Sequence, residues 1–172
     1  MIEGALVRDL TAHVDARGRF IETFRQEWLP SDAKDMRQGN RADRVAGSIV
    51  GLHFHRHQAD WWYLLAGRAR MVLHDLRVGS PTEGKTVEVE LTEDQPRGIY
   101  IPRGIAHGFS AITDVTLTYL VDGYYDPADE LGLAWDDPDL HADWGVVDPV
   151  LSERDQRNPR RSEIAHLPVF SR

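Results

Sequence analysis

Four side chains with metal-binding or acid–base chemistry occur at short spacings in the chain: His53, His55, Asp60 and His107. His53 and His55 are two residues apart, so on a strand both side chains point to the same side. Three imidazoles and one carboxylate can hold a divalent metal such as Zn, Fe, Ni or Mn. A free imidazole can instead act as a general base near neutral pH. The residues leave both roles open for His53.

Glycines and a proline frame these residues in two motifs. The first is Gly47-x5-His53-x-His55-x4-Asp60-x6-Gly67, and the second is Pro102-x-Gly104-x2-His107. This spacing resembles the two motifs of the cupin barrels, with Asp in place of the usual Glu. The resemblance implies an all-β double-stranded β-helix, or jelly-roll barrel, with a small-ligand pocket in its mouth.

Short extended segments separated by turn residues run through most of the chain. Strands are predicted at residues 20–24, 48–54, 61–65, 69–76, 86–91, 99–101 and 115–121. Many short strands at regular spacing indicate a sandwich or barrel. Peripheral segments are predicted as a short helix or loop (28–36), an irregular flap closing one end (126–150) and a short helix or frayed end (from 160). The prediction is a single domain over residues 1–172 with short peripheral helices.

Composition and charge narrow the functional classes. Charged residues make up 28% and hydrophobic residues 41% of the 172 residues, which is typical of a globular domain. The net charge of -8 provides no electrostatic footprint for nucleic acid or a membrane surface, and the chain has no cysteine for disulfides or thiolate chemistry. The first residues lack the apolar run of a signal peptide, and no stretch approaches the ~18 apolar residues of a membrane span. We therefore expect a cytoplasmic protein.

Further short motifs occur in order along the chain. They are DARGRFIE (15–22), RQGN (37–40), GLHF (51–54), DLRVGSPT (75–82), IPRGIAHGF (101–109), YYDP (124–127), LAWDDP (133–138) and LSERD (151–155). Together they resemble the dTDP-4-keto-6-deoxyglucose 3,5-epimerase (dTDP-4-dehydrorhamnose 3,5-epimerase) family, the cofactor-free cupins of dTDP-rhamnose biosynthesis. The resemblance implies a homodimeric epimerase that inverts carbon 3, carbon 5 or both in a dTDP-4-keto-6-deoxyhexose, without a cofactor.

The resemblance also implies roles for individual residues. His53 matches the catalytic base, Asp155 the carboxylate that orients it, and Tyr119 the proton donor on the other face of the sugar. Arg17, Gln38 and Asn40 match residues that contact the nucleotide or its phosphates. Phe20 and Glu22 match residues that reach the nucleotide from the partner subunit. Tyr125 matches a tyrosine that stacks on the base, and His107 matches a pocket histidine.

Three positions depart from the family pattern. Val50 stands where the family has Arg, Asp60 where it has Lys, and His55 where it has Gln. A carboxylate near a developing enolate opposes the reaction, whereas the three changes together restore a metal-binding pattern.

Two alternatives to the epimerase therefore stay open. One is a metal-dependent isomerase, lyase or oxygenase with one divalent ion on His53, His55, Asp60 and His107. A histidine cannot be a free base and a ligand through the same nitrogen, so the base would then be another group. The other alternative is a non-catalytic sugar-binding cupin.

Overall fold

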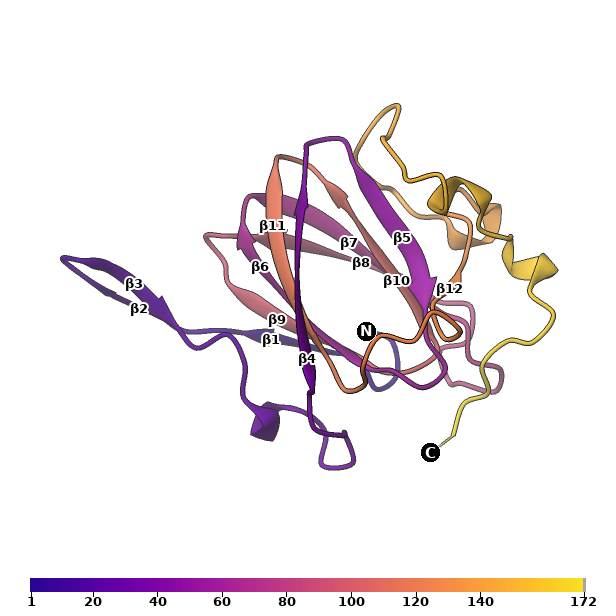
Figure 1. The fold of residues 1–172 in the computed structure, drawn as a ribbon, viewed down its shortest axis with the longest axis horizontal. Coiled ribbons are helices and arrows are strands. Elements are labelled where there is room, and N and C mark those ends of the chain that lie inside the picture. The colour runs from indigo at the N-terminus through magenta and orange to yellow at the C-terminus, as the bar shows by residue number, and fades with distance from the viewer. Residues whose placement is uncertain (172) are drawn as a thin grey trace.

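The structure is a computed structural model that describes residues 1–171, and Arg172, the last residue of the predicted domain, lies outside the described residues. Two antiparallel sheets of five strands face each other (Figure 1). The first contains, in spatial order, β1 (Leu6–Asp9), β9 (Arg97–Ile101), β6 (Asp60–Ala66), β11 (Val115–Val121) and β4 (Gln38–Arg44). The second contains β12 (Leu131–Gly132), β5 (Ile49–Phe54), β10 (Ile105–Ala111), β7 (Arg68–Asp75) and β8 (Thr86–Thr92). The predicted all-β jelly-roll fold is confirmed.

The remaining elements are small. Strands β2 (Ala12–Asp15) and β3 (Gly18–Ile21) form a separate hairpin. The predicted peripheral helices are single 3-10 turns, and residues 1–171 contain no α-helix. These turns are η1 (Gln26–Trp28), η2 (Pro138–Leu140), η3 (Asp155–Arg157) and η4 (Arg161–Glu163). No helix in this described range is long and apolar enough to cross a membrane.

The strand predictions are right for the apolar strands and wrong or missing elsewhere. Strands β5, β6, β7, β8, β9 and β11 lie where they were predicted, within about two residues. The predicted strand at 20–24 is only partly right, because β3 ends at Ile21. The prediction missed β1, β2, β4, β10 and β12.

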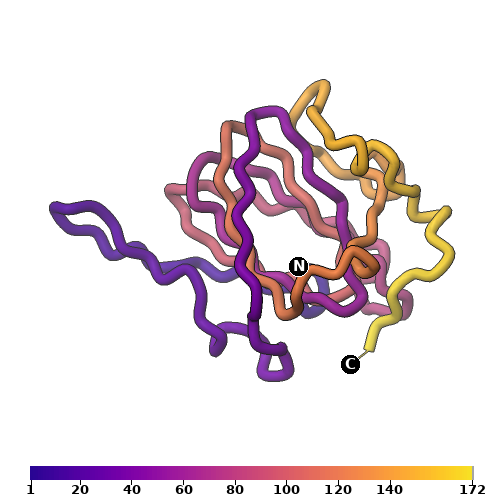
Figure 2. Tube along the Cα trace, in the orientation of Figure 1, coloured from indigo at the N-terminus to yellow at the C-terminus, as the bar shows by residue number. Residues whose placement is uncertain are grey.

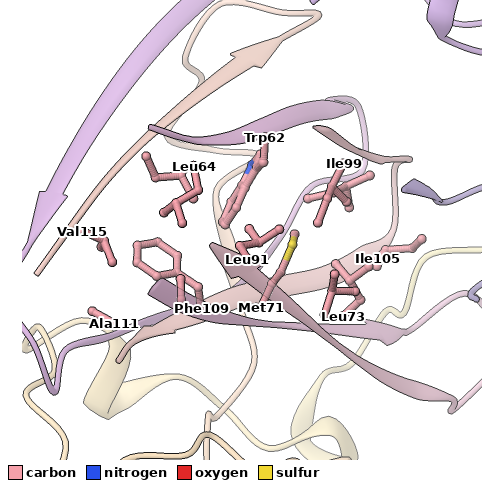
Figure 3. Packing of buried hydrophobic residues seen from close by; sticks show 14 of the residues in the cluster. Trp62, Leu64, Met71, Leu73, Leu91, Ile99, Ile105, Phe109, Ala111 and Val115 are labelled. Atoms are coloured by element: carbon pink, nitrogen blue, oxygen red, sulfur yellow. The ribbon is translucent and has the colours of Figure 1, made fainter. Parts of the chain in front are cut away.

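Each sheet packs against the other on its inner face and is partly covered on its outer face. Between the sheets, alternate side chains such as Trp62, Leu64, Met71 and Phe109 form the main core (Figure 3). The outer face of the first sheet carries Trp61, Tyr63 and Tyr100, covered by the segment that includes Leu29 and Trp28. The outer face of the second sheet is covered by the chain after β12, through Leu133, Leu140 and Trp144. Figure 2 shows this last segment wrapping the outside of the barrel on its way to the C-terminus.

A buried ionic network closes the loop after β7. The Asp75 carboxylate accepts hydrogen bonds from Arg77 Nε (2.8 Å), Ser80 Oγ (2.6 Å) and Thr82 Oγ1 (2.7 Å). Burial by itself raises the pKa of Asp75, but these hydrogen bonds outweigh burial and lower the pKa to about 2. The network explains why Asp, Arg, Ser and Thr occur together in this loop.

We predict that Asp75→Asn lowers the free energy of unfolding by about 3–5 kcal/mol at pH 7, because it leaves the buried Arg77 guanidinium without a counter-charge. The folded pKa of about 2 lies below the unfolded value of about 3.9, so this stabilisation is complete above about pH 4 and is lost as the pH falls toward 2. Urea unfolding at pH 7 and at pH 2 measures the difference in the free energy of unfolding between Asp75→Asn and wild type. The exposed Asp94→Asn is the control, and equal stability of Asp75→Asn and wild type at pH 7 would contradict the prediction.

Candidate functional site

A cavity of about 150 Å³ lies between the two sheets. Strands β4, β6 and β11 line it from one sheet, and β5 and β10 from the other. Its wall contains six of the residues that the sequence predicts for the site: Gln38, Asn40, His53, His107, Tyr119 and Tyr125. Polar side chains share this lining with apolar ones such as Val50, Phe109 and Leu117, whereas the core beyond it is apolar.

His53 and Asp155 form a buried hydrogen-bonded pair at one side of this cavity. His53 is on β5, Asp155 begins η3, and His53 Nε2 lies 2.7 Å from Asp155 Oδ1. Burial by itself raises the pKa of Asp155, but the hydrogen bond from His53 leads the interactions that outweigh burial and hold this pKa below its ordinary value. Asp155 is therefore a carboxylate, and it accepts the Nε2 proton. The lone pair of the neutral ring is then on Nδ1.

Glu130 is a site residue that the sequence reasoning missed. Its Oε1 lies 3.6 Å from His53 Nδ1 and 3.1 Å from Arg154 Nη1, and it lines the same cavity. Glu130 directly precedes β12, which pairs with β5 so that Gly132 lies opposite His53. No spacing motif marks it, because it reaches the site from the segment predicted as an irregular flap.

Tyr119 approaches the cavity from the opposite sheet. It is on β11, between Asn40 of β4 and Trp62 of β6. Burial raises the pKa of Tyr119, with smaller contributions from the negative charges of Asp60 and Glu130. Its hydroxyl therefore keeps its proton at neutral pH and can donate it into the cavity.

His55, Asp60 and His107 gather in a second cluster of the same cavity. One potential ligand atom from each lies within 4.8 Å of the others, and all three residues are buried. His53 is not a member of this cluster. The structure thus brings together three of the four residues predicted as a metal-binding set and places the fourth in the pair with Asp155.

Arg17, predicted to contact the nucleotide or its phosphates, and the predicted partner-subunit residues Phe20 and Glu22 all lie outside the cavity of their own chain. Phe20 is on the β2–β3 hairpin, which projects away from the barrel (Figure 1). Arg17, at the tip of this hairpin, pairs with Asp15, and Glu22 pairs with Arg25. One chain therefore does not bring Arg17, Phe20 or Glu22 to the site.

Three arginines are candidates to replace the family arginine whose position Val50 occupies. Arg44 lines the cavity beside Val50 and His53. Arg41 is paired with Asp43, and Arg56 donates a hydrogen bond to the backbone oxygen of His166. Of the three, Arg44 is the one positioned to reach a bound anion.

The fold and this cavity define the class: a cupin-type jelly-roll barrel with acid–base residues on facing walls. Comparison with known proteins gives the family. A family model described as dTDP-4-dehydrorhamnose 3,5-epimerase matches residues 1–163, and the chain belongs to this family. A dTDP-4-dehydrorhamnose 3,5-epimerase from Methanothermobacter thermautotrophicus is 34% identical over 96% of this chain and 95% of its own length.

Solved structures agree in fold. The 4-keto-6-deoxy sugar epimerase NovW of Streptomyces spheroides superposes with a TM-score of 0.91 at 35% identity, covering 98% of this chain and 90% of NovW. The 3,5-epimerase RmlC of Legionella pneumophila, solved in complex with dTDP-4-keto-L-rhamnose, superposes with a TM-score of 0.93 at 30% identity. That match covers 99% of this chain and 96% of the Legionella protein.

We predict that Asp155→Asn changes the tautomer of His53. In wild type the carboxylate selects the Nε2–H form, whereas the asparagine amide can present its N–H₂ group and favour the Nδ1–H form. Long-range proton–nitrogen NMR of the imidazole distinguishes the two forms, with His53→Asn used for assignment. An unchanged Nε2–H form in Asp155→Asn would contradict this role of Asp155.

Proposed function

We propose that this protein is an isomerase that epimerises a dTDP-4-keto-6-deoxyhexose at carbon 3, carbon 5 or both, in deoxysugar biosynthesis. The observation that carries the proposal is the pairing of a base and an acid across one cavity. His53, oriented by Asp155, is on one sheet, and Tyr119 is on the facing sheet. Inversion of a carbon needs proton removal on one face and delivery on the other.

In the proposed mechanism, Nδ1 of His53 removes a hydrogen from a carbon next to the 4-keto group. The ketone acidifies that hydrogen because the electron pair left behind is delocalised onto the ketone oxygen as an enolate. The imidazolium formed on His53 is stabilised by Asp155 at Nε2, 2.7 Å away, and by Glu130 near Nδ1, 3.6 Å away. These two carboxylates make proton transfer to His53 more favourable.

Tyr119 then delivers a proton to the opposite face of the enolate. The carbon–hydrogen bond forms as the phenol O–H bond breaks, and the enolate electrons return to the carbon. The cycle closes when His53 releases its proton to solvent and Tyr119 regains one. Because burial raises the pKa of Tyr119, the phenol holds its proton at neutral pH and has it available for this step.

Gln38, Asn40 and Tyr125 form a polar rim that supports nucleotide binding. Gln38 Nε2 donates to Asn40 Oδ1 at 2.9 Å, and Gln38 Oε1 accepts from the backbone N–H of Tyr125 at 3.0 Å. The Tyr125 side chain is 62% exposed, so its ring is available for stacking on a nucleobase. The Legionella relative, solved with dTDP-4-keto-L-rhamnose, supports the same substrate class for this cavity.

We predict that His53→Asn and Tyr119→Phe separate the two proton transfers. His53→Asn should lower kcat by about 10²–10⁴-fold and abolish exchange of substrate hydrogens with deuterated water, because the base is lost. Tyr119→Phe should also abolish epimerised product but retain deuterium exchange on the face that His53 attacks. NMR of a dTDP-4-keto-6-deoxyhexose in deuterated water measures both results.

The matched control for the tyrosine is Tyr124→Phe, because Tyr124 is 73% exposed and does not line the cavity. It should behave as wild type. Full turnover in His53→Asn or Tyr119→Phe would overturn the proposed mechanism. Binding of the sugar nucleotide with no exchange in the wild type would indicate the non-catalytic sugar-binding alternative.

We also propose that the protein is a homodimer in which the β2–β3 hairpin of one chain reaches the cavity of its partner. The hairpin carries apolar side chains without a core to cover them, with Val14 77% exposed and Phe20 64% exposed. Figure 2 shows the hairpin extending well clear of the barrel. Such an arm gains burial only by contacting another molecule.

A mixing experiment tests this arrangement. Phe20→Ala should raise KM, and His53→Asn should abolish turnover, but a dimer containing one chain of each has one intact site. Random mixing should therefore restore roughly a quarter of wild-type activity at low substrate concentration, because half of the dimers are mixed and one of their two sites is intact. Light scattering should give twice the chain mass. A monomeric mass or no recovery on mixing would overturn the proposal.

A further inference from the structure

The cluster of His55, Asp60 and His107 has the composition and burial of a metal-binding site. His55 is 6%, Asp60 2% and His107 4% exposed, and the three ligand atoms lie within 4.8 Å of one another. His107 Nε2 lies 3.8 Å from Asp60 Oδ2, and the rings of His55 and His107 are 5.4 Å apart between centroids. Two imidazoles and one carboxylate around an open space form a three-ligand face for a divalent transition metal.

The surrounding hydrogen bonds already orient both imidazoles for binding. His55 Nδ1 lies 2.9 Å from the backbone oxygen of Asp129, and His107 Nδ1 lies 2.9 Å from that of Ile105. A carbonyl oxygen only accepts, so both Nδ1 atoms are the donors and both neutral rings carry their lone pair on Nε2. Within residues 1–171 neither Nε2 has a hydrogen-bond partner. Outer hydrogen bonds of this kind fix metal-binding histidines.

Asp60 is oriented in the same way and lacks a permanent counter-charge. Gln58 Nε2 donates to its Oδ1 at 3.0 Å, and Trp62 Nε1 donates to its Oδ2 at 3.0 Å. In the described chain, the one basic side chain within 4.0 Å of this carboxylate is His107, and no lysine or arginine pairs with it. Buried charges are normally paired or bound to a metal, so this carboxylate is the strongest single indication of a cation here.

We propose that His55, Asp60 and His107 bind one divalent transition-metal ion in the wall of the cavity, with the remaining coordination positions open to the bound ligand. Imidazole ligands favour ions such as Zn, Fe or Ni over calcium. His53 is not a ligand in this arrangement, because it does not belong to the cluster whose ligand atoms lie within 4.8 Å of one another. The site therefore needs three ligands instead of the four that the spacing motif alone indicates, and it leaves His53 free to act as a base.

The ion also resolves an electrostatic conflict, a step that rests on the proposed function. A lone carboxylate at Asp60 would oppose the negative charge that develops on the ketone oxygen. A divalent ion bound to that carboxylate reverses the local charge and can polarise the ketone as a Lewis acid. Acid–base catalysis by His53 and Tyr119 and electrostatic help from a metal are then compatible in one cavity.

Binding of cobalt(II) to chelator-stripped, untagged protein tests the site without any sugar. We expect about one ion per chain by elemental mass spectrometry, with visible absorption typical of mixed nitrogen and oxygen coordination. His55→Gln and Asp60→Asn should weaken binding at least ~100-fold by calorimetry. His53→Asn should bind as wild type does. Circular dichroism establishes that each variant is folded.

His57→Gln is the matched control, because His57 is an exposed histidine two residues from His55 and is not in the cluster. It should bind cobalt as wild type does. Absence of binding in the wild type, or undiminished binding in His55→Gln, would overturn the site. Loss in His53→Asn would overturn the three-ligand assignment. Since no substrate is present, metal binding by a protein that lacks epimerase activity would refute the proposed function and leave this site standing.

Discussion

The hydrogen bond between His53 and Asp155 is the interaction on which the rest of the site depends. It joins a barrel strand to the wrapping segment after β12, since Asp155 belongs to that segment, is 4% exposed and also accepts a hydrogen bond from the backbone N–H of Gly51 at 3.4 Å. The bond occupies one nitrogen of His53 and directs the other toward the cavity. In the proposed arrangement, proton transfer by His53 and metal binding by the neighbouring cluster, to which His53 does not belong, are separate within a space of about 150 Å³.

The barrel can hold a polar cavity because its stability comes from elsewhere. The apolar half of the interior and both outer faces of the sheets are packed with large side chains, including Trp61, Phe109 and Trp144. Burial of such side chains contributes about 1.5–3 kcal/mol each. The cavity-facing positions of β4, and some of those of β5 and β10, are thus available for polar groups. The N-terminal segment and the chain after β12 also support the site indirectly, because they cover outer faces that would otherwise be exposed.

The sequence predicts well those features that depend on local pattern. Alternating apolar strands and the histidine spacing indicated the barrel, and the resemblance to the family named six residues that line the cavity. Strand β4 was missed because it faces a polar cavity, so Gln38, Asn40 and Arg44 stand where a core strand has apolar residues. Glu130 was missed because it reaches His53 through pairing of β12 with β5, which no local pattern encodes. The spacing of the four candidate metal ligands likewise could not show that one of them, His53, forms a hydrogen bond with Asp155, about a hundred residues away.

The departures from the family pattern are best understood as a rearrangement of charge within one cavity. Val50 removes a cation from β5, while Arg44 of β4 lines the same cavity. Asp60 places a carboxylate 3.8 Å from His107, and His55 adds a second imidazole beside it. An isolated substitution of a cation by Asp60 would leave a buried anion and oppose an enolate. The neighbouring His55 and His107 change this conclusion. Together with Asp60 they form a set of ligands for a metal ion, and such an ion can replace the lost positive charge. In the proposed arrangement, the three histidines of the spacing motif divide into one proton acceptor and two ligands.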